Sequence, residues 1–287
     1  MKKIQVGFLV SYDYELLKNA IPPIYNDSDA IYLAIDKDRL TWNGSLFQID
    51  DSFFLWIKEF DTQNKIEIYQ DVFYVPELST MECEVRQRKM LADRMGVGNW
   101  IIQLDADEYF LNFKKFISDI KKYDKYLKSS NRKQIQISAY LINIYKFVGD
   151  GFLFVDEPTR CLTATNFPNY KIGRNTRKRI IYTDNIILHE TLSRSEEELE
   201  IKFKNWGHKN ELNPHFLEKW KSATKENYDS IKNVFYIEPE KWKSLSYVSG
   251  KNISEISSNF DFKKFLPSKF YIFRKNFGQW FKFLFKK

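Results

Sequence analysis

The amino-acid sequence predicts an α/β protein built on a mixed, mainly parallel sheet with helices on its faces. Two observations predict this class. Short apolar segments alternate with segments of helical pattern over the first 112 residues, and parallel strands need crossovers of this kind. A chain of 287 residues with 43% hydrophobic residues can also bury a large core, which excludes disordered and collagen-like proteins.

The first half supplies the strands and their crossovers. Four short apolar segments are typical of buried strands, at residues 4–11, 30–35, 65–69 and 100–104. Residues 15–25 predict a short helix interrupted by Pro22-Pro23, and residues 80–95 a helix that ends at Gly96. Because helices connect these strands, we expect them to run parallel.

The second half is predicted to mix strands and helices. A lysine-rich helix at 113–127 precedes a long strand at 134–148, and shorter strands are expected at 151–155, 177–182 and 185–189. Ser195 stands three residues before Glu198, the spacing of a capping box that opens a helix. Helical segments then continue to about residue 236.

Several protein classes are excluded by composition. Cys83 and Cys161 lie far apart and outside any CxxC pattern, so we expect buried thiols and neither a disulfide nor a zinc site. No apolar run approaches the roughly 20 residues of a transmembrane helix, and the first residues do not fit a secretory signal. We therefore expect a cytoplasmic protein, with peripheral attachment to the inner face of a membrane as the one further option.

The net charge of +7 is concentrated at the C-terminal end. Residues 263–287 contain eight lysines and arginines and no acid, so the rest of the chain is close to neutral. At helical spacing one face carries Phe270, Phe273, Phe277, Trp280, Phe281 and Leu284, and the opposite face carries Lys275, Lys282 and Lys286. This pattern predicts an interfacial helix for an anionic membrane surface. The alternatives are packing against the body of the protein or a partner, and nucleic-acid binding by the same basic and aromatic residues, although we expect no nucleic-acid partner.

The sharpest motif follows the fourth predicted strand, in the segment WIIQLDADE. Asp105, Asp107 and Glu108 place three carboxylates within four positions, where they repel one another unless a cation or a ring of donors lies among them. In open α/β sheets, ligands bind just beyond the carboxyl ends of the strands. The alternative is a solvated loop in which Asp107 or Glu108 caps a helix.

WIIQLDADE resembles the signature of GT-A glycosyltransferases, particularly the bacterial family 2 enzymes of lipopolysaccharide-core and capsule synthesis. The resemblance implies a GT-A (Rossmann-like) fold and a divalent cation, Mn²⁺ or Mg²⁺, on the diphosphate of a nucleotide sugar, most simply a UDP-sugar. Asp107 would ligate the cation, and Asp105 would contact the ribose or the cation. The later segment 177–190, which ends in His-Glu, is similar to the part of these enzymes that supplies a further ligand, here His189.

Other positions follow from the same resemblance and from the chemistry. Asp36, at the end of the second strand, would contact the base or ribose, and His208, after a later helix, the diphosphate or acceptor. Leaving-group charge on the diphosphate favours cationic neighbours, and the candidates are Arg86, Arg88, Arg177 and Arg179.

An inverting transferase needs a carboxylate base to take the proton of the acceptor hydroxyl. The candidates are Glu190, then Glu157 and Asp156. The Glu-Asp base motif of many family 2 enzymes is not found in that order, which leaves the choice open.

The sequence therefore predicts a metal-dependent inverting glycosyltransferase that transfers a sugar to a cell-surface glycan or lipid-linked acceptor. Residues 1–220 would form the catalytic domain, divided into a nucleotide-sugar half (1–112) and an acceptor half (113–220). Residues 221–287 would form a helical extension with the basic tail. The alternatives are a sugar-phosphate nucleotidyltransferase, which the absence of a Gly-rich phosphate loop disfavours, and a non-catalytic basic adaptor for membranes or nucleic acid.

Overall fold

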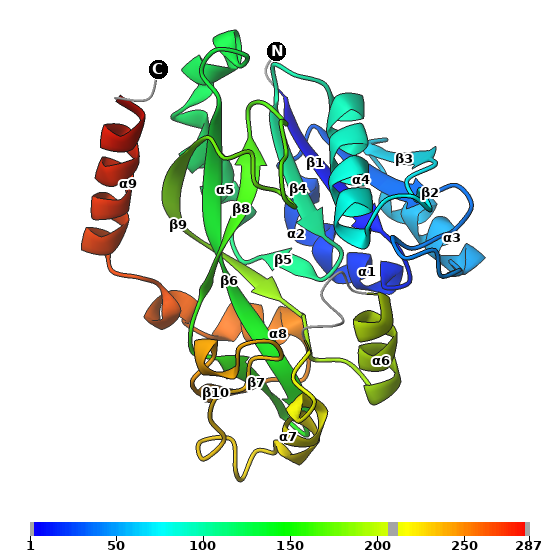
Figure 1. Ribbon diagram of the computed structural model, residues 1–287, viewed down its shortest axis with the longest axis vertical. Coiled ribbons are helices and arrows are strands. Elements are labelled where there is room, and N and C mark those ends of the chain that lie inside the picture. The colour runs from blue at the N-terminus through cyan, green and yellow to red at the C-terminus, as the bar shows by residue number, and fades with distance from the viewer. Residues whose placement is uncertain (1–2, 206–211, 285–287) are drawn as a thin grey trace.

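A computed structural model describes residues 3–205 and 212–284, and one mixed sheet organises the chain (Figure 1). The strands of the first half are β1 (Ile4–Val10), β2 (Ala30–Asp36), β3 (Ile66–Asp71), β4 (Trp100–Asp105) and β5 (Glu108–Phe110). Those of the second half are β6 (Ile135–Val148), β7 (Gly151–Val155), β8 (Thr159–Thr165), β9 (Arg179–His189) and β10 (Leu245–Ser249). The strand order is β10-β7-β6-β8-β4-β1-β2-β3, with β9 beside β6 and β5 beside β9.

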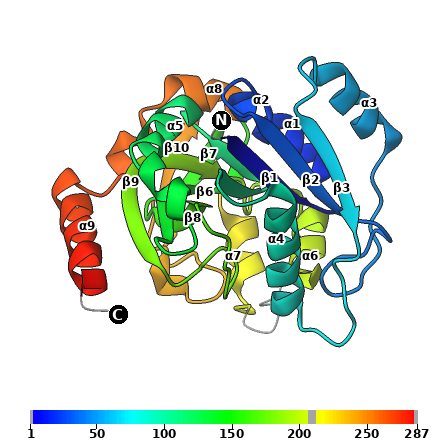
Figure 2. The ribbon, with the colours of Figure 1, turned by 90° about the horizontal axis from the view of Figure 1, so that it is seen from above.

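The parallel half of the sheet is as expected. Strand β1 pairs in parallel with β2 and β4, and β2 with β3. Alternate residues of β1 enter different cores: Phe8 packs with α1 (Leu17–Ala20), α2 (Pro22–Tyr25) and α3 (Asp51–Phe60), whereas Leu9 packs with α4 (Thr80–Met95). Figure 2 shows these two helical layers on either side of β1–β3.

Helix α4 lies unusually close to the sheet. A Cβ at Gly7 of β1 would lie 2.8 Å from Leu91 Cδ2, so a larger residue at this position would require the Leu91 side chain to shift. The helix begins at a capping box, in which Ser79 and Glu82 each accept from the other's backbone N–H, and it ends at Gly96. The predicted limits of this helix are confirmed.

The sheet also contains short antiparallel strands that the sequence did not predict. Strands β5 and β8 were missed, and β8 lies between β4 and β6 with antiparallel pairing on both sides. The two strands expected at 177–182 and 185–189 are one strand, β9, parallel to β6 with an irregular register between Ser138 and Tyr140. Helix α5 (Phe113–Lys121) is shorter than expected and is followed by a 3₁₀ segment (Asp124–Ser129).

The segment 221–287 is not the purely helical extension that was expected. Its strand β10 pairs antiparallel with β7 at one edge of the sheet. Helices α6 (Glu196–Asn205) and α7 (Phe216–Ser222) precede it, and α8 (Ile253–Asn259) and α9 (Lys269–Leu284) follow. Within the described residues, none of these helices is both long and apolar enough to cross a bilayer. Cys83 and Cys161 are buried and unpaired, as predicted.

Candidate functional site

A cavity lies at the carboxyl ends of β1, β2 and β4, the edge of an open α/β sheet where ligands bind. Its walls come from these strand ends, the loop that follows β2, and helices α4 and α6, and the end of β9 closes it. The acidic, basic and histidine side chains on the walls are Asp13, Asp36, Glu84, Arg88, Asp105, Asp107, His189 and Lys202. The acidic motif thus faces a cavity that also contains cationic groups.

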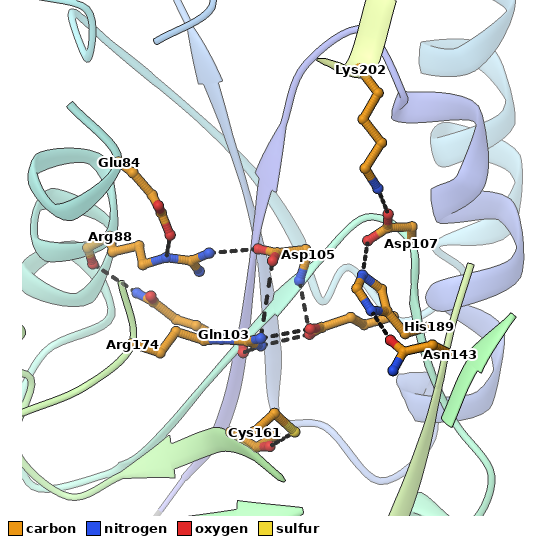
Figure 3. Close-up of polar contacts among 12 residues, drawn as sticks. Glu84, Arg88, Gln103, Asp105, Asp107, Asn143, Cys161, Arg174, His189 and Lys202 are labelled. Carbon is orange, nitrogen blue, oxygen red and sulfur yellow. Dashed lines mark hydrogen bonds and ion pairs between the residues drawn. The ribbon is translucent and has the colours of Figure 1, made fainter. Parts of the chain in front are cut away.

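Asp105 belongs to an ion network with two arginines (Figure 3). Its Oδ1 accepts from Arg88 Nη2 at 2.7 Å, and its Oδ2 lies 4.0 Å from Arg174 Nη2. Arg174 donates to both carboxylate oxygens of the buried Glu108, at 2.6 Å each. Burial opposes ionisation of Asp105, but Arg88 and Arg174 outweigh it and lower the pKa of this carboxyl. The fold itself therefore supplies cationic partners to both acids and favours the ionised form of Asp105.

Asp107 has a different set of partners. Its Oδ2 accepts from Arg194 Nη2 at 2.7 Å and from Lys202 Nζ at 2.8 Å. Burial opposes the charge, yet Lys202, then His189 and Arg194, hold the pKa of Asp107 well below its usual range. Burial and the nearby Arg194 lower the pKa of Lys202. The Oδ1 atom faces His189.

His189 is oriented by a second polar residue. Its Nδ1 lies 2.8 Å from Asn143 Oδ1, and Nδ1–H must donate because an amide oxygen only accepts. In the neutral ring Nε2 then carries a lone pair, and it lies 3.5 Å from Asp107 Oδ1. Two acceptors that face each other repel unless a proton or a cation lies between them.

This donor set fits a divalent cation whose remaining ligands come from a substrate. A histidine that binds a metal commonly donates its other N–H to an oxygen acceptor, as His189 does to Asn143. Over residues 3–205 and 212–284, no group of three or more His, Cys, Asp or Glu side chains is placed to hold a metal. The two atoms His189 Nε2 and Asp107 Oδ1 would thus need substrate phosphates, as in many Mg²⁺ sites.

Strand pairing brings the two predicted motifs together. In the antiparallel ladder between β5 and β9, Glu108 stands opposite His189, and the backbone N–H of Glu190 donates to the Asp107 carbonyl at 2.9 Å. The acidic motif and the His-Glu pair are therefore neighbours in space although they are far apart in the chain.

Helix α6 delivers Lys202 to the site. Its predicted capping box is confirmed, since the Ser195 N–H donates to Glu198 Oε2 at 2.7 Å and the Glu198 N–H to Ser195 Oγ at 3.2 Å. Leu199 and Phe203, one turn apart, are buried against the α7 region. Lys202 then points towards Asp107 from beside this apolar stripe (Figure 3).

Asp36 supports the cavity wall. Its carboxylate accepts from four backbone N–H groups, those of Asp38, Leu40, Phe73 and Tyr74, at 2.8–3.2 Å. These bonds occupy the roughly four acceptor sites of a carboxylate. The geometry therefore does not support the expected contact between this carboxylate and a ribose. Instead, Asp36 stabilises the loops that follow β2 and β3.

Glu190 stands immediately beyond His189. Its Oε2 accepts from the buried Tyr109 hydroxyl at 2.6 Å, and burial raises the pKa of the Glu190 carboxyl. No hydrogen bond to Oε1 is found in the part of the chain that the structure describes. Glu190 is next to the cavity but does not line it.

The other predicted residues lie apart from the cluster. Asp156 accepts from the hydroxyls of Ser244 and Ser246, and Glu157 accepts from the Lys243 N–H. Both carboxylates therefore contact the β10 region, and the prediction that either is the base is withdrawn. Among the arginines, Arg86 donates to the Val72 carbonyl outside the cavity.

Arg177 and Arg179 lie at the opposite end of β9 from His189. Arg179 and this histidine are the two ends of the 11-residue strand, ten residue steps or roughly 33 Å apart. Neither arginine can share a phosphate charge at the cavity. His208 lies outside the described residues.

Sequence reasoning missed several residues of the cluster. Glu84 and Asn143 lie inside regular elements with no local signal, and Arg174 and Arg194 lie in loops. Lys202 is one of two lysines in α6. In the sequence, only the capping box at Ser195 indicated where α6 begins, and therefore where Lys202 lies.

Comparison with protein-family descriptions finds no match, and no curated protein matches the chain. Among solved structures, S. aureus TarS 1–349 has a TM-score of 0.30 and 10% identity over 49% of this chain and 36% of that one. Mannose-6-phosphate isomerase from Helicobacter pylori has a TM-score of 0.29 and 9% identity over 47% and 51%. The chain thus spans about half or less of either protein, and similarities this weak carry no argument.

Proposed function

We propose that the protein is a metal-dependent, inverting glycosyltransferase of the GT-A type that takes a nucleotide sugar, most simply a UDP-sugar, as donor. The observation that carries the proposal is the pairing of Asp107 Oδ1 with His189 Nε2 at a distance of 3.5 Å, beside a cavity at the carboxyl ends of parallel strands. Mn²⁺ or Mg²⁺ held there would draw charge from the leaving diphosphate as a Lewis acid.

The cationic side chains of the cluster support binding of a diphosphate. Lys202 and Arg194 already contact Asp107, and Arg88 lines the same cavity. Arg88 Nη1 is buried without a hydrogen-bond partner among the described residues, and a phosphate oxygen is a favoured acceptor for a guanidinium. Asp105, whose side chain is 37% exposed, keeps an oxygen for a ribose hydroxyl or the cation.

The reaction needs one base. The acceptor hydroxyl oxygen attacks the anomeric carbon as the bond from that carbon to the nucleoside diphosphate breaks, and the hydroxyl proton passes to a carboxylate. We assign Glu190 to this role, because Tyr109 holds Oε2 in place and Oε1 is left for the acceptor. Acceptors would be glycans or lipid-linked saccharides.

The test measures donor binding and turnover. For the unaltered protein, we expect Mn²⁺ with a UDP-sugar to raise the melting temperature, EDTA to reverse this effect, and donor hydrolysis or transfer to require the metal. Asp107→Asn should lower turnover by roughly 10²–10³-fold, corresponding to the several kcal/mol that a Lewis acid supplies. Asp150→Asn, at an exposed turn and paired with Lys225, is the matched control.

The outcomes separate the alternatives. Turnover that is unchanged by EDTA and by Asp107→Asn would overturn the proposal. Consumption of a sugar 1-phosphate with a nucleoside triphosphate, without sugar transfer, would replace it with a nucleotidyltransferase. Loss of turnover in Glu190→Gln with retained donor binding supports the assigned base, whereas unchanged turnover would remove Glu190 from the mechanism.

A further inference from the structure

Helix α9 stands at one edge of the molecule, against β9 (Figures 1 and 2). Asn276 bonds both the N–H and the carbonyl of Tyr182, at 2.8 and 2.9 Å, and Gln279 accepts from the Ile180 N–H at 3.1 Å. These side-chain amides satisfy backbone groups that an edge strand leaves open. One face of α9 therefore has a structural role, which fixes where its other faces point.

An adjacent face of α9 carries large aromatic side chains that are about half exposed or more. They are 47–74% exposed, and at helical spacing they form a continuous stripe of Phe270, Phe273, Phe277, Trp280 and Phe281. Phe277 contacts both Trp280 and Phe281, with ring centroids 6.1 and 6.5 Å apart. An exposed apolar patch of this size marks an interaction site.

The charge around this stripe restricts its partner. Lys269 and Arg274 lie on either side of the stripe and are exposed, and no Asp or Glu occurs between residues 262 and 287. In the preceding 3₁₀ segment (Phe262–Phe265), Lys263 and Lys264 are also exposed. A second copy of the chain would place one basic helix against another, whereas an anionic lipid surface complements both the aromatic rings and the bases.

We propose that α9 docks the protein on an anionic membrane leaflet, with the aromatic stripe in the headgroup–acyl boundary and the bases at the lipid phosphates. The amide contacts to β9 make the helix a fixed part of the body, so docking orients the whole molecule. Tyr182 and His189 are seven residues apart along β9, which places the cavity on the order of 23 Å from these contacts. Docking would thus present the cavity close to lipid-borne acceptors.

The test is flotation of the full chain with vesicles of phosphatidylcholine alone and of phosphatidylcholine mixed with phosphatidylglycerol in equal parts. We expect binding to the mixed vesicles only, weakened by salt. Phe273→Ser with Phe277→Ser should lower partitioning by roughly 100-fold or more, because each buried phenylalanine contributes substantially. Lys269→Ser with Arg274→Ser should lower it by roughly 30-fold.

The controls separate docking from folding and from catalysis. Leu55→Ser removes an exposed apolar side chain on α3, and it should leave vesicle binding unchanged. All variants should keep their melting temperature and their metal-dependent binding of a UDP-sugar, because α9 does not line the cavity. Failure of the proposed catalytic function would leave vesicle binding unaffected, so the two proposals can fail separately.

Three results would overturn the docking proposal. One is binding that does not depend on phosphatidylglycerol or on the stripe. A second is a dimer that the double phenylalanine variant converts to a monomer while vesicles bind neither form. The third is tight binding of single-stranded DNA through the same residues with no vesicle binding.

Discussion

Asp105 and Asp107 are two residues apart, but the structure gives them opposite settings. Asp105 and its neighbour Glu108 share an ion network with Arg88 and Arg174, and Glu108 is completely paired within the protein. Asp107 keeps one oxygen for Arg194 and Lys202 and turns the other towards His189 Nε2. The first setting joins two acids to two arginines, whereas the second joins one acid to a lysine, an arginine and a histidine beside the cavity.

The comparison shows that an acidic triplet is not one functional unit. Glu108 is opposite His189 in the strand ladder, yet its carboxylate points to Arg174 and serves the fold. Asp107 points to the other side, where β9 and α6 meet. The turn at residues 106–107, between β4 and β5, thus separates Asp107 from Asp105 and Glu108, whose carboxylates face the two arginines.

The largest expected effect is a loss of stability when the ion pair between Arg174 and Glu108 is broken. Arg174→Met leaves the buried Glu108 carboxylate unpaired, and breaking a buried pair in this way costs about 3–5 kcal/mol of unfolding free energy. Denaturant unfolding measures this loss. The double change Arg174→Met with Glu108→Met should recover most of it, since two apolar groups leave no charge uncompensated.

Arg94→Met is the control for this experiment. Arg94 and Glu67 form an ion pair at 2.6 Å, but both side chains are exposed. Because exposed pairs contribute little, the unfolding midpoint should not change measurably. Equal losses in Arg174→Met and Arg94→Met would contradict the structural role given to the Glu108 network.

A smaller effect, on metal affinity, is expected when the hydrogen-bond partner of His189 is removed. Asn143→Ala removes the acceptor that orients the histidine, and the loss of such a partner typically lowers metal affinity by about 10–100-fold. The dependence of the melting temperature on Mn²⁺ concentration measures the affinity. Asn185→Ala, another buried asparagine in the same sheet, should change stability but not the apparent metal affinity.

The smallest effect is a local one. Burial raises the pKa of the Cys161 thiol to about 11, so little of it is thiolate at neutral pH. Iodoacetamide should label it very slowly in the native protein and faster in Arg174→Met, because the less stable variant opens more often and exposes the thiol, an effect that outweighs the loss of a guanidinium that lowers the thiol pKa. Peptide mapping distinguishes Cys161 from Cys83, and rapid labelling of Cys161 in the unaltered protein would contradict the packing described.

Part of the fold could be predicted because its signals are local. The strands of the parallel half, the limits of α4 and the capping box at Ser195 depend on residues within a turn or a strand. Strands β5, β8 and β10 could not be predicted, because a short antiparallel strand is stabilised by its partner and its own pattern is weak. The continuous β9 was divided in prediction by polar residues at 183–185, which α5 and β6 satisfy.

The candidate site divides in the same way. The sequence by itself determined that acids close a central strand and that a His-Glu pair follows a later apolar run, because both are contiguous patterns. Only the tertiary structure decided which carboxylates are free for chemistry, since that depends on long-range partners such as Arg174 and Lys202. Asp36 shows the same limit: its four backbone donors come from two loops that are brought together only by pairing of β2 and β3.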